Sequence, residues 1–474
     1  MKTCQQLTVM VVLAVIVLAI TGCPEPKPDP KPEPQIPTFT AVADLGVWLT
    51  SQPTNTAGTP YTVKVNVNDL GGSSYTSGSI GDALKASNTK YVNLDISGST
   101  FTSIGRYAFS QCTGLTSVTI PNSVTSIEDV SFDYCTSLTA ININSENTAY
   151  SSTGGVLYNK NKTILIKYPA GKTGSSFTIP NSVTTIENRA FSRCTSLTSV
   201  TLPNSVISIG DYVFEYCTNL TNVTIPDSVI SIGLYAFSRC TSLASITIPN
   251  SITTIRYSAF SGCSNLMSIF VVADNPAFSS EDGILYNKNK TVLLAYPGGK
   301  IDDITIPVSV TTIGEHAFRY HGLTSIVIPN SIKTIEGYAF SYCSSIASVT
   351  IPDSVTSIKY NAFMACTSLT SIVIPTSVTI IEPYTFSSSG LTSITIPSSV
   401  TSIGTGAFFS CYSLTSVTFA GTILSNNFDN TTGSWSAFFG DLRDKFYATN
   451  AINGTPGTYT TTAPVSESSV WVKQ

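Results

Sequence analysis

The feature that most constrains this chain is a phenylalanine that recurs every 23 residues. Phe191, Phe214, Phe237 and Phe260 keep this spacing, and a cysteine follows each of them three positions later. Eleven such Phe turns can be counted along the chain. A repeat of this length predicts a solenoid, because one unit cannot bury its own apolar face and needs neighbours on both sides.

The first half of each unit has the spacing of a short strand. Leu197, Val200 and Leu202 follow an L-x-x-V-x-L pattern, so their apolar side chains are expected to point into the coil. Pro203 follows at once and cannot donate to a ladder, so it ends the strand. Stacked in register, these strands predict a parallel β-sheet on one flank of the solenoid.

The second half of each unit has a different spacing. Val206, Ile209 and Val213 lie three and four residues apart, which predicts a short helical or 3₁₀ turn. Asn204 and Ser205 are expected to cap its start. The chain therefore reads as an α/β solenoid, with strands on one flank and short helical turns on the other.

The repeat resembles a known family. Units of the form LTSVTIPxSVTSIGxxAFxxC are similar to the BspA-like leucine-rich repeats of bacterial surface proteins, over about two-thirds of the chain. The resemblance implies a right-handed leucine-rich-repeat coil. It also implies a cell-surface adhesin or protein-binding module for host matrix, host cells or other bacteria, with no catalytic residues to carry over.

The beginning of the chain has the pattern of an export signal. Residues 7–20 are apolar apart from Thr8, a length that suits a signal peptide better than a membrane span. The run ends in Ile-Thr-Gly-Cys, which resembles the bacterial lipobox, so Cys23 is expected to be lipidated. The alternative is an ordinary signal peptide in which Cys23 is incidental. Lipidation would anchor the exported chain to a bacterial membrane, with the outer membrane and cell surface favoured.

These patterns divide the chain into five segments. They are a signal peptide (1–22), a lipidated Cys with a Pro-rich spacer (23–37), an N-terminal cap (38–100), the repeat solenoid (101–420) and a C-terminal cap (421–474). Within the N-terminal cap, residues 61–67 alternate like a strand and residues 80–86 predict a helical turn. The caps are expected because a solenoid needs its open ends covered.

Two longer units interrupt the array near residues 144–176 and 272–303. Both contain GxLYNKNKTxL followed by YPxGK, and the Asn-rich centre tolerates a tight turn. Each is interpreted as a β-hairpin with a connecting loop. Its lysine-bearing tip is either a contact point or a solubilising loop.

The cysteines favour buried thiols over disulfides. Nine of the eleven occupy the same repeat position, where register stacking brings neighbours within reach of a disulfide, yet Ser389 and His321 replace them in other copies. A site that accepts these replacements favours free thiols that act as small apolar side chains. The nine are Cys112, Cys135, Cys194, Cys217, Cys240, Cys263, Cys343, Cys366 and Cys411.

Composition and spacing give no support for catalysis, metal or nucleic acid. The net charge is −4 and no basic stripe occurs, so nucleic-acid binding has no electrostatic basis. We expect no cofactor and no metal, because there are no phosphate-binding motifs and only two histidines. His316 and His321 lie in one variable turn and are expected to be surface residues. Carboxylates are dispersed rather than convergent, so no enzyme is predicted.

Two surfaces are candidates for recognition. The strand face repeats Thr-Ser-x-Thr, as in residues 198–201, and predicts a ladder of hydroxyls. The turns around each Ala-Phe are rich in Tyr and Arg, residues that dominate interface anchors. The alternative is that these side chains only stack along the rod and stabilise adjacent turns. The candidate binding surface is Tyr107, Tyr134, Arg189, Arg193, Tyr212, Tyr216, Tyr235, Arg239, Tyr257, Tyr320, Tyr338, Tyr342, Tyr360 and Tyr384.

Together these features predict a lipid-anchored surface protein that adheres to protein or glycan partners through many weak contacts. The alternative is a structural or assembly component of the envelope that binds other surface proteins of the same cell. A carbohydrate-processing enzyme is disfavoured, because it would need a groove with clustered acids.

Overall fold

The computed structural model describes residues 35–71, 79–301, 304–429 and 436–474. The signal peptide, Cys23 and most of the spacer lie outside these residues. The chain divides into two units, Met1–Pro37 and Thr38–Gln474, and only the second is described below. No helix within the described ranges is long and apolar enough to cross a membrane.

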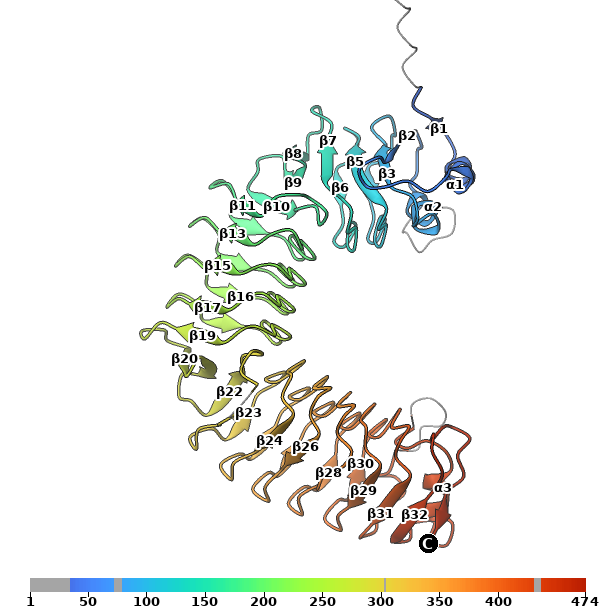
Figure 1. Ribbon diagram of the computed structural model, residues 1–474, viewed down its shortest axis with the longest axis vertical. Coiled ribbons are helices and arrows are strands. Elements are labelled where there is room, and N and C mark those ends of the chain that lie inside the picture. The colour runs from blue at the N-terminus through green and yellow to red at the C-terminus, as the bar shows by residue number, and fades with distance from the viewer. Residues whose placement is uncertain (1–34, 72–78, 302–303, 430–435) are drawn as a thin grey trace, which may run out of the picture. The chain divides into compact units, whose positions relative to one another are not determined.

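The second unit is a solenoid whose rungs follow one another in chain order, as the colours of Figure 1 show. Its first ladder consists of the short strands that carry the S-V-T segments. Pairing is parallel and in repeat register: Val200 lies opposite Val223, one unit further along the chain. The strands are β5 (Leu115–Ile120), β7 (Ala140–Ile143), β11 (Ser176–Thr178), β13 (Ser199–Thr201), β15 (Asn222–Thr224), β17 (Ser245–Ile248), β19 (Ser268–Val271), β24 (Ser325–Val327), β26 (Ser348–Thr350), β29 (Ser393–Ile396) and β31 (Ser416–Phe419).

A second parallel ladder lies where helical turns were predicted, so that prediction is wrong. Residues 208–209 form a two-residue strand in the middle of the stretch predicted to be helical, and the described residues contain no 3₁₀ helix. Backbone groups here bond to neighbouring rungs instead of to their own turn. The strands are β4 (Ser103–Ile104), β6 (Ser126–Ile127), β12 (Thr185–Ile186), β14 (Ser208–Ile209), β16 (Ser231–Ile232), β18 (Thr254–Ile255), β23 (Thr312–Ile313), β25 (Thr334–Ile335), β27 (Ser357–Ile358), β28 (Ile380–Ile381) and β30 (Ser402–Ile403).

In several rungs, the serine that precedes the second-ladder strand has a different role from the predicted helix cap. The Ser205 hydroxyl donates to the Val183 carbonyl of the previous rung at 2.6 Å, and Ser228 donates to Val206 at 2.7 Å. The same contact recurs at Ser251 with the Val229 carbonyl. These serines therefore tie rungs together.

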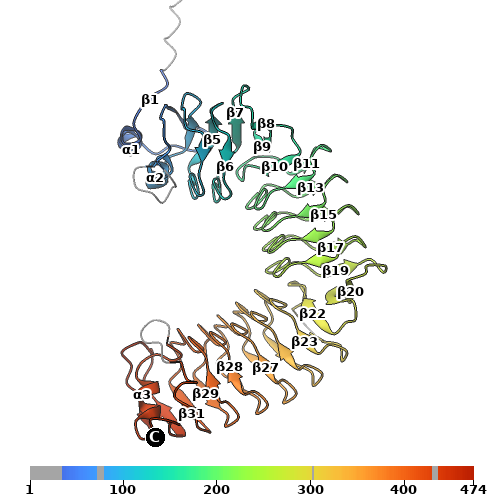
Figure 2. The same cartoon turned by 180° about the vertical axis from the view of Figure 1, so that it is seen from behind.

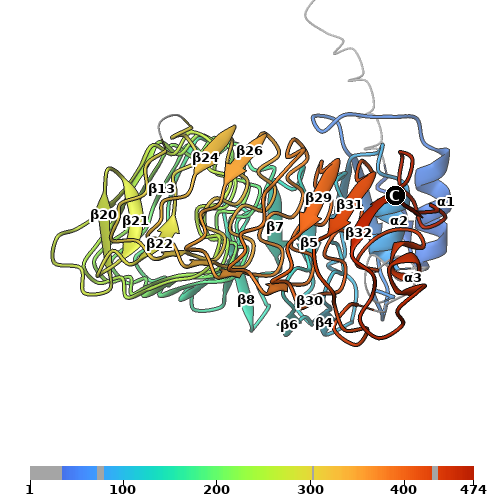
Figure 3. The ribbon, with the colours of Figure 1, turned by 90° about the horizontal axis from the view of Figure 1, so that it is seen from below.

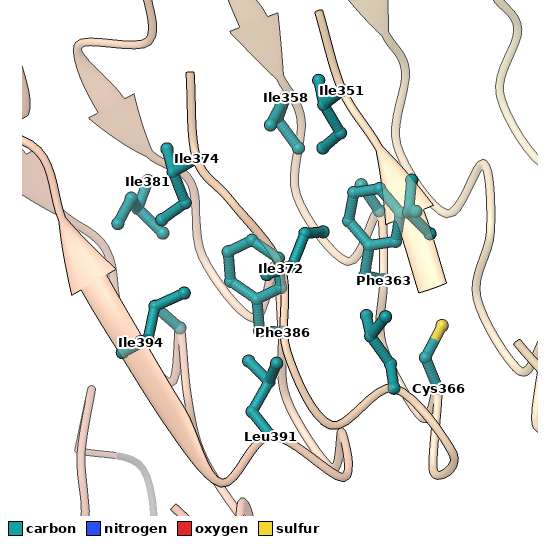
Figure 4. Packing of buried hydrophobic residues seen from close by; sticks show 14 of the residues in the cluster. Ile351, Ile358, Phe363, Cys366, Ile372, Ile374, Ile381, Phe386, Leu391 and Ile394 are labelled. Atoms are coloured by element: carbon teal, nitrogen blue, oxygen red, sulfur yellow. The ribbon is translucent and has the colours of Figure 1, made fainter. Parts of the chain in front are cut away.

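The phenylalanines form a stacked row inside the coil. Phe191, Phe214 and Phe237 have ring centroids 5.3 Å apart in each consecutive pair. Phe363 and Phe386 lie 5.7 Å apart, side by side among isoleucines from both ladders (Figure 4). This spacing matches the distance between neighbouring strands in a sheet, so each ring extends the same apolar column by one rung.

All nine repeat cysteines are buried free thiols, as predicted. Each Sγ is placed to donate to a backbone carbonyl of a preceding rung, for example from Cys240 to Phe214 at 3.1 Å and from Cys263 to Phe237 at 3.0 Å. Burial raises the pKa of Cys263 to about 12. The cysteine is therefore a small residue that fills space and satisfies a carbonyl.

The two inserts each add three strands. β8 (Tyr150–Thr153), β9 (Val156–Asn159) and β10 (Ile164–Lys167) pair antiparallel, and β10 then joins β12 in the second ladder. β20 (Phe278–Glu281), β21 (Ile284–Asn287) and β22 (Val292–Ala295) repeat this arrangement and join β23. Buried Asn147 and Asn275 hold the base of each insert, because their amides donate to two carbonyls of the preceding rung.

Each insert also contributes one ring to the aromatic row. Tyr168 stacks on Phe191 at 5.3 Å and Tyr296 on Phe318 at 4.9 Å. These tyrosines belong to the YPxGK segments, so each long unit contains an extra rung with a shortened turn.

Different structures complete the two ends. At the N-terminal end, β1 (Thr38–Phe39), β2 (Tyr61–Val65) and β3 (Val92–Asp95) extend the first sheet, and α1 (Val42–Ser51) packs on α2 (Ile80–Ala86). α2 matches the predicted helical turn, whereas α1 was not predicted. At the other end, α3 (Leu442–Tyr447), β32 (Gly457–Thr460) and β33 (Val472–Lys473) follow β31, and Trp471 is buried there. Figures 2 and 3 show α1, α2 and α3 beside the terminal rungs.

Candidate binding surface

The turn around each phenylalanine has an unusual backbone. In all eleven turns, the residues two before and two after the Phe have positive φ, between 53° and 73°. A side chain at such a position costs roughly 1–2 kcal/mol, and glycine avoids this cost. The Phe lies midway between the two left-handed residues. In this backbone conformation, the N–H groups of all three residues point toward the next rung.

The residues at these positions form two columns along the solenoid. We call the residues two before each Phe the first column and the residues two after it the second column. Tyr or Arg occupies six of the eleven positions in each column. These twelve are all candidate residues from the sequence, while Tyr257 and Tyr360 lie one position before the first column.

The second column is an alternating stack of cations and rings. Arg193 lies over Tyr134 at 3.8 Å and over Tyr216 at 4.2 Å from each ring centroid. Arg239 lies 4.1 Å from the Tyr320 ring. Gly262 stands between them in sequence and contributes no side chain, and a Cβ there would meet Arg239 at 3.1 Å. The glycine therefore leaves the space through which Arg239 reaches Tyr320.

The first column is a second stack. Arg189 lies 3.9 Å from the Tyr212 ring, and Tyr212 stacks on Tyr235 at 5.1 Å. The Arg189 guanidinium also lies between the carboxylates of Asp133 (3.6 Å) and Glu215 (3.4 Å). Partial burial raises the pKa of Glu215, with Arg189 opposing that shift.

Both histidines are buried, so the prediction that they decorate the surface is wrong. His316 occupies the first column and stacks on Tyr338 at 4.8 Å with the planes 5° apart. Burial, followed by the nearby Arg319, lowers the pKa of His316 to about 3. The repeat spacing places His316 at a position that holds Tyr or Arg in most other turns. This spacing was the signal in the sequence from which its stacking could have been predicted.

His321 takes the place of the repeat cysteine. Its Nδ1 accepts the Leu323 N–H at 3.1 Å, so Nε2 carries the hydrogen and donates to the Pro297 carbonyl, also at 3.1 Å. Burial lowers the pKa of His321 to about 4. The neutral imidazole thus makes the carbonyl contact that a thiol makes in other rungs.

The comparisons with known proteins agree with this repeat geometry. The family model described as "BspA type Leucine rich repeat region" matches with six copies, at residues 79–173, 170–282 and 295–415. The chain belongs to this family. Its BspA-type repeats therefore place it among bacterial leucine-rich repeat surface proteins, and solenoids of this family are typically protein-interaction modules.

Solved structures of related repeat proteins are similar. A leucine rich cell surface protein from Faecalibacterium prausnitzii is 31% identical, with 66% of this chain and 76% of that chain covered and a TM-score of 0.41. A leucine-rich repeat protein from Eubacterium ventriosum is 27% identical over 70% and 77% of the two chains (TM-score 0.37). The pneumococcal vaccine antigen PcpA is 21% identical over 70% and 78% (TM-score 0.46). No curated protein matches.

The strand face of the BspA-type repeats offers fewer free groups than the sequence predicts. In several rungs, the threonine that opens the S-V-T segment donates its hydroxyl to the previous rung, from Thr198 to the Ser175 carbonyl at 2.9 Å and from Thr221 to Thr198 at 3.1 Å. These hydroxyls stabilise the ladder. Among the described residues, no group of three or more His, Cys, Asp or Glu is placed to hold a metal ion.

Part of the aromatic surface remains open to solvent. Tyr134, Tyr257, Tyr342 and Tyr360 are 39%, 56%, 36% and 40% exposed. The Tyr360 hydroxyl donates to Glu315 at 2.9 Å, and its pKa is raised to about 12, by desolvation first and then by this carboxylate. The Tyr360 hydroxyl therefore stays neutral at neutral pH, and the four exposed rings present apolar faces to solvent.

Proposed function

We propose that this chain is a lipid-anchored cell-surface adhesin whose Tyr and Arg columns bind protein or glycan partners. The observation that carries the proposal is the choice of residue at the left-handed positions. Gly262, Gly406 and Asn361 show that small residues are compatible with these sites, yet Tyr or Arg stands at most of them.

Stacking between rungs recovers part of the backbone cost. An exposed cation–π contact contributes about 0.5–1 kcal/mol, less than the roughly 1–2 kcal/mol that a left-handed side chain costs. Stability alone therefore does not favour Tyr and Arg over glycine. The same residues give large, rigid contact area with few rotatable bonds, and this suits recognition.

Repetition fits the expected mode of binding. Single exposed rings contribute little, but a row of them on one rigid scaffold binds a repetitive or extended partner with the advantage of multivalency. Family membership supports a role in binding proteins, and the name of the Faecalibacterium relative places that protein at the cell surface.

The binding experiment compares two sets of exposed residues. The chain is tested on immobilised extracellular-matrix proteins and on host cells, with Tyr134, Tyr257, Tyr342 and Tyr360 each changed to Ser. Exposed Val327→Ser on β24 and exposed Val373→Ser, at the equivalent position of a later repeat, are the matched controls. We expect the four Tyr variants together to lose at least tenfold in binding, while the controls and the circular dichroism spectrum stay unchanged. Equal binding by both sets would refute the role of the exposed tyrosines in and beside the columns.

The anchor and its alternative have their own tests. Mass spectrometry of the mature N-terminus should show acyl chains on Cys23, and an unmodified Cys23 would contradict the lipid anchor. Crosslinking on intact cells should capture host or foreign proteins. Capture of envelope proteins of the same cell alone would favour the structural role instead.

A further inference from the structure

Regular turns of the solenoid are joined by a third ladder of backbone hydrogen bonds. In each, the N–H groups of both left-handed residues and of the Phe donate to carbonyls of the next turn. Tyr212, Phe214 and Tyr216 do so at 2.8–2.9 Å, to Leu234, Ala236 and Ser238. All three bonds are present in the turns of Phe191, Phe214, Phe237, Phe318, Phe340, Phe363 and Phe386.

The ladder is open at the two turns that precede the inserts. Within the described residues, the N–H groups of Val130, Phe132 and Tyr134 find no backbone acceptor, and the same is true at Ser258, Phe260 and Gly262. The cause is the shortened YPxGK turn of each insert, which supplies a ring to the aromatic row but lacks the outer half of a normal turn. Each insert therefore leaves a notch about one rung wide between two full turns.

The second notch, between turns 256–263 and 314–321, is closed by its own side chains. The Tyr257 ring lies 6.0 Å from the His316 ring, and Arg319 reaches across to hydrogen bond with the Tyr235 hydroxyl. Only a cavity of about 90 Å³ remains. This notch is too small for a guest, because ligand cavities measure about 300–1,000 Å³.

The first notch, between turns 128–135 and 187–194, keeps a larger cavity, although Arg189 and Arg193 cross it to Asp133 (3.6 Å) and Tyr134 (3.8 Å). Asp129 stands where the second notch has Tyr257, and Ser192 stands where it has Arg319. The cavity measures about 420 Å³. Val130 on one wall has an unused N–H and Asn188 on the other has a carbonyl that accepts no hydrogen bond in the described part of the chain.

These two groups match the two sides of a peptide unit. In every regular turn, the N–H that corresponds to Val130 bonds to the carbonyl that corresponds to Asn188 in the next turn, as Arg189 does with Asp211 at 3.0 Å. A guest backbone between the walls would accept from Val130 and donate to Asn188. This restores the ladder by the same physics as the addition of a strand to an open sheet edge.

The charged side chains that line the first notch favour a peptide with a positively charged side chain. Four carboxylates (Glu128, Asp129, Asp133 and Glu187) face two cations (Lys167 and Arg189), which leaves a net charge of −2. Arg106 lies 3.4 Å from Asp129 and offsets part of this at the rim. Asp133 is 6% exposed and its Oδ1 has no hydrogen-bond partner, so a negative charge in the wall is incompletely satisfied.

We propose that the first notch binds an extended peptide segment of a partner protein, with a Lys or Arg side chain directed to Asp133 and Glu187. Main-chain bonds to Val130 and Asn188 hold the segment, and the acidic lining selects its basic residue. This site is separate from the Tyr and Arg columns, and it does not depend on the adhesin proposal.

The test uses hydrogen exchange of the full chain with a defined probe, the acetylated and amidated peptide Thr-Val-Thr-Lys-Thr-Val-Thr. We expect the peptide to slow exchange in residues 128–135 at least tenfold and to leave residues 256–263 unchanged. The same peptide with Glu in place of Lys should bind at least tenfold more weakly. No protection at 128–135 with the Lys peptide would overturn the proposal. Equal protection by N-acetyl-lysine methylamide would also overturn it, because that result describes a cation site.

Variants locate the site. Ala149 lines the first notch, and Ala277 is its counterpart in the second insert, so Ala149→Trp should abolish binding while Ala277→Trp keeps it. Asp133→Ser introduces the residue found at this turn position in other rungs and should remove most of the preference for Lys over Glu. Unchanged preference in Asp133→Ser would overturn the assigned charge selection. Tyr342→Ser should bind the peptide normally, which separates this site from the columns.

Discussion

His321 makes the stability of the solenoid depend on pH in a defined direction. The unfolded imidazole binds a proton with a pKa near 6.5, whereas burial lowers the folded pKa to about 4. Between these values the unfolded state binds more protons, so the free energy of unfolding falls as the pH drops from about 6.5 to 4. At about 1.4 kcal/mol per pH unit, lowering the pH to 5 costs about 2 kcal/mol.

His321→Cys isolates this contribution because cysteine is the residue at this position in neighbouring rungs. We expect the variant to lose about 2 kcal/mol less than the parent chain between pH 7 and pH 5. At pH 7 it should be less stable by about 1 kcal/mol, since the Leu323 N–H loses its acceptor.

The assay is hydrogen exchange of amides in residues 318–324, corrected for the intrinsic effect of pH, because long repeat arrays do not always unfold as one unit. His316→Tyr, which restores the residue of neighbouring first-column positions, is the matched comparison for the other buried imidazole. If His321→Cys and the parent chain lose the same local stability on acidification, the burial argument is wrong.

Three further predictions concern the core. Phe214→Ala should lower the free energy of unfolding by about 3–5 kcal/mol in urea, because it empties one place in the aromatic row; a loss below about 1 kcal/mol would contradict the row as the main packing element. Asn275→Ala should cost about 2–4 kcal/mol by thermal unfolding, since two carbonyls lose their donor, and exposed Asn219→Ala is its control. The nine repeat thiols should resist alkylation at pH 8 until denaturant is added, because all nine are buried, and burial raises the pKa of Cys135, for example, to about 12; rapid reaction of the folded chain would contradict this.

The repeat spacing predicted the interior of the protein well. Residues with a fixed place in the 23-residue unit, such as Phe214, Cys217 and Val200, are all buried as expected. Their positions follow from hydrophobic burial, which depends mainly on pattern. The register between rungs followed too, because identical units stack with equivalent residues opposite each other.

The second half of the unit was predicted wrongly for a local reason. Val206, Ile209 and Val213 have the three-and-four spacing of a helix, but the next rung supplies hydrogen-bond partners that an isolated segment lacks. Ile209 pairs with Ile186 and Ile232 across rungs, and Tyr212 takes a left-handed conformation that ends any helix. Single-sequence periodicity contains no information on these neighbours.

The candidate surface could be predicted as a set of residues and not as an arrangement. Variable Tyr and Arg around each Phe indicated which turns have these side chains, while the stacking of Arg193 between two rings depends on left-handed backbone that no residue type there signals. Nothing in the sequence pattern indicated a contact role for Arg319, because Ser occupies its repeat position in most rungs. The long Arg319 side chain crosses the second notch. This notch exists because the YPxGK turn of the insert lacks the outer half of a normal turn.

The two inserts divide this solenoid into parts that differ in their packing. Its buried residues fall into three separate clusters that meet near the insert strands, so the apolar core is least continuous there. Side chains take over at these places: Arg193 joins Tyr134 across the first notch, and Arg239 joins Tyr320 across the second. A contact between an Arg and an aromatic ring requires that particular pair of side chains, whereas an apolar core position accepts several different apolar residues. Among the described residues, the turns before the two inserts are also the places where all three backbone N–H groups of the third ladder have no acceptor in a neighbouring turn.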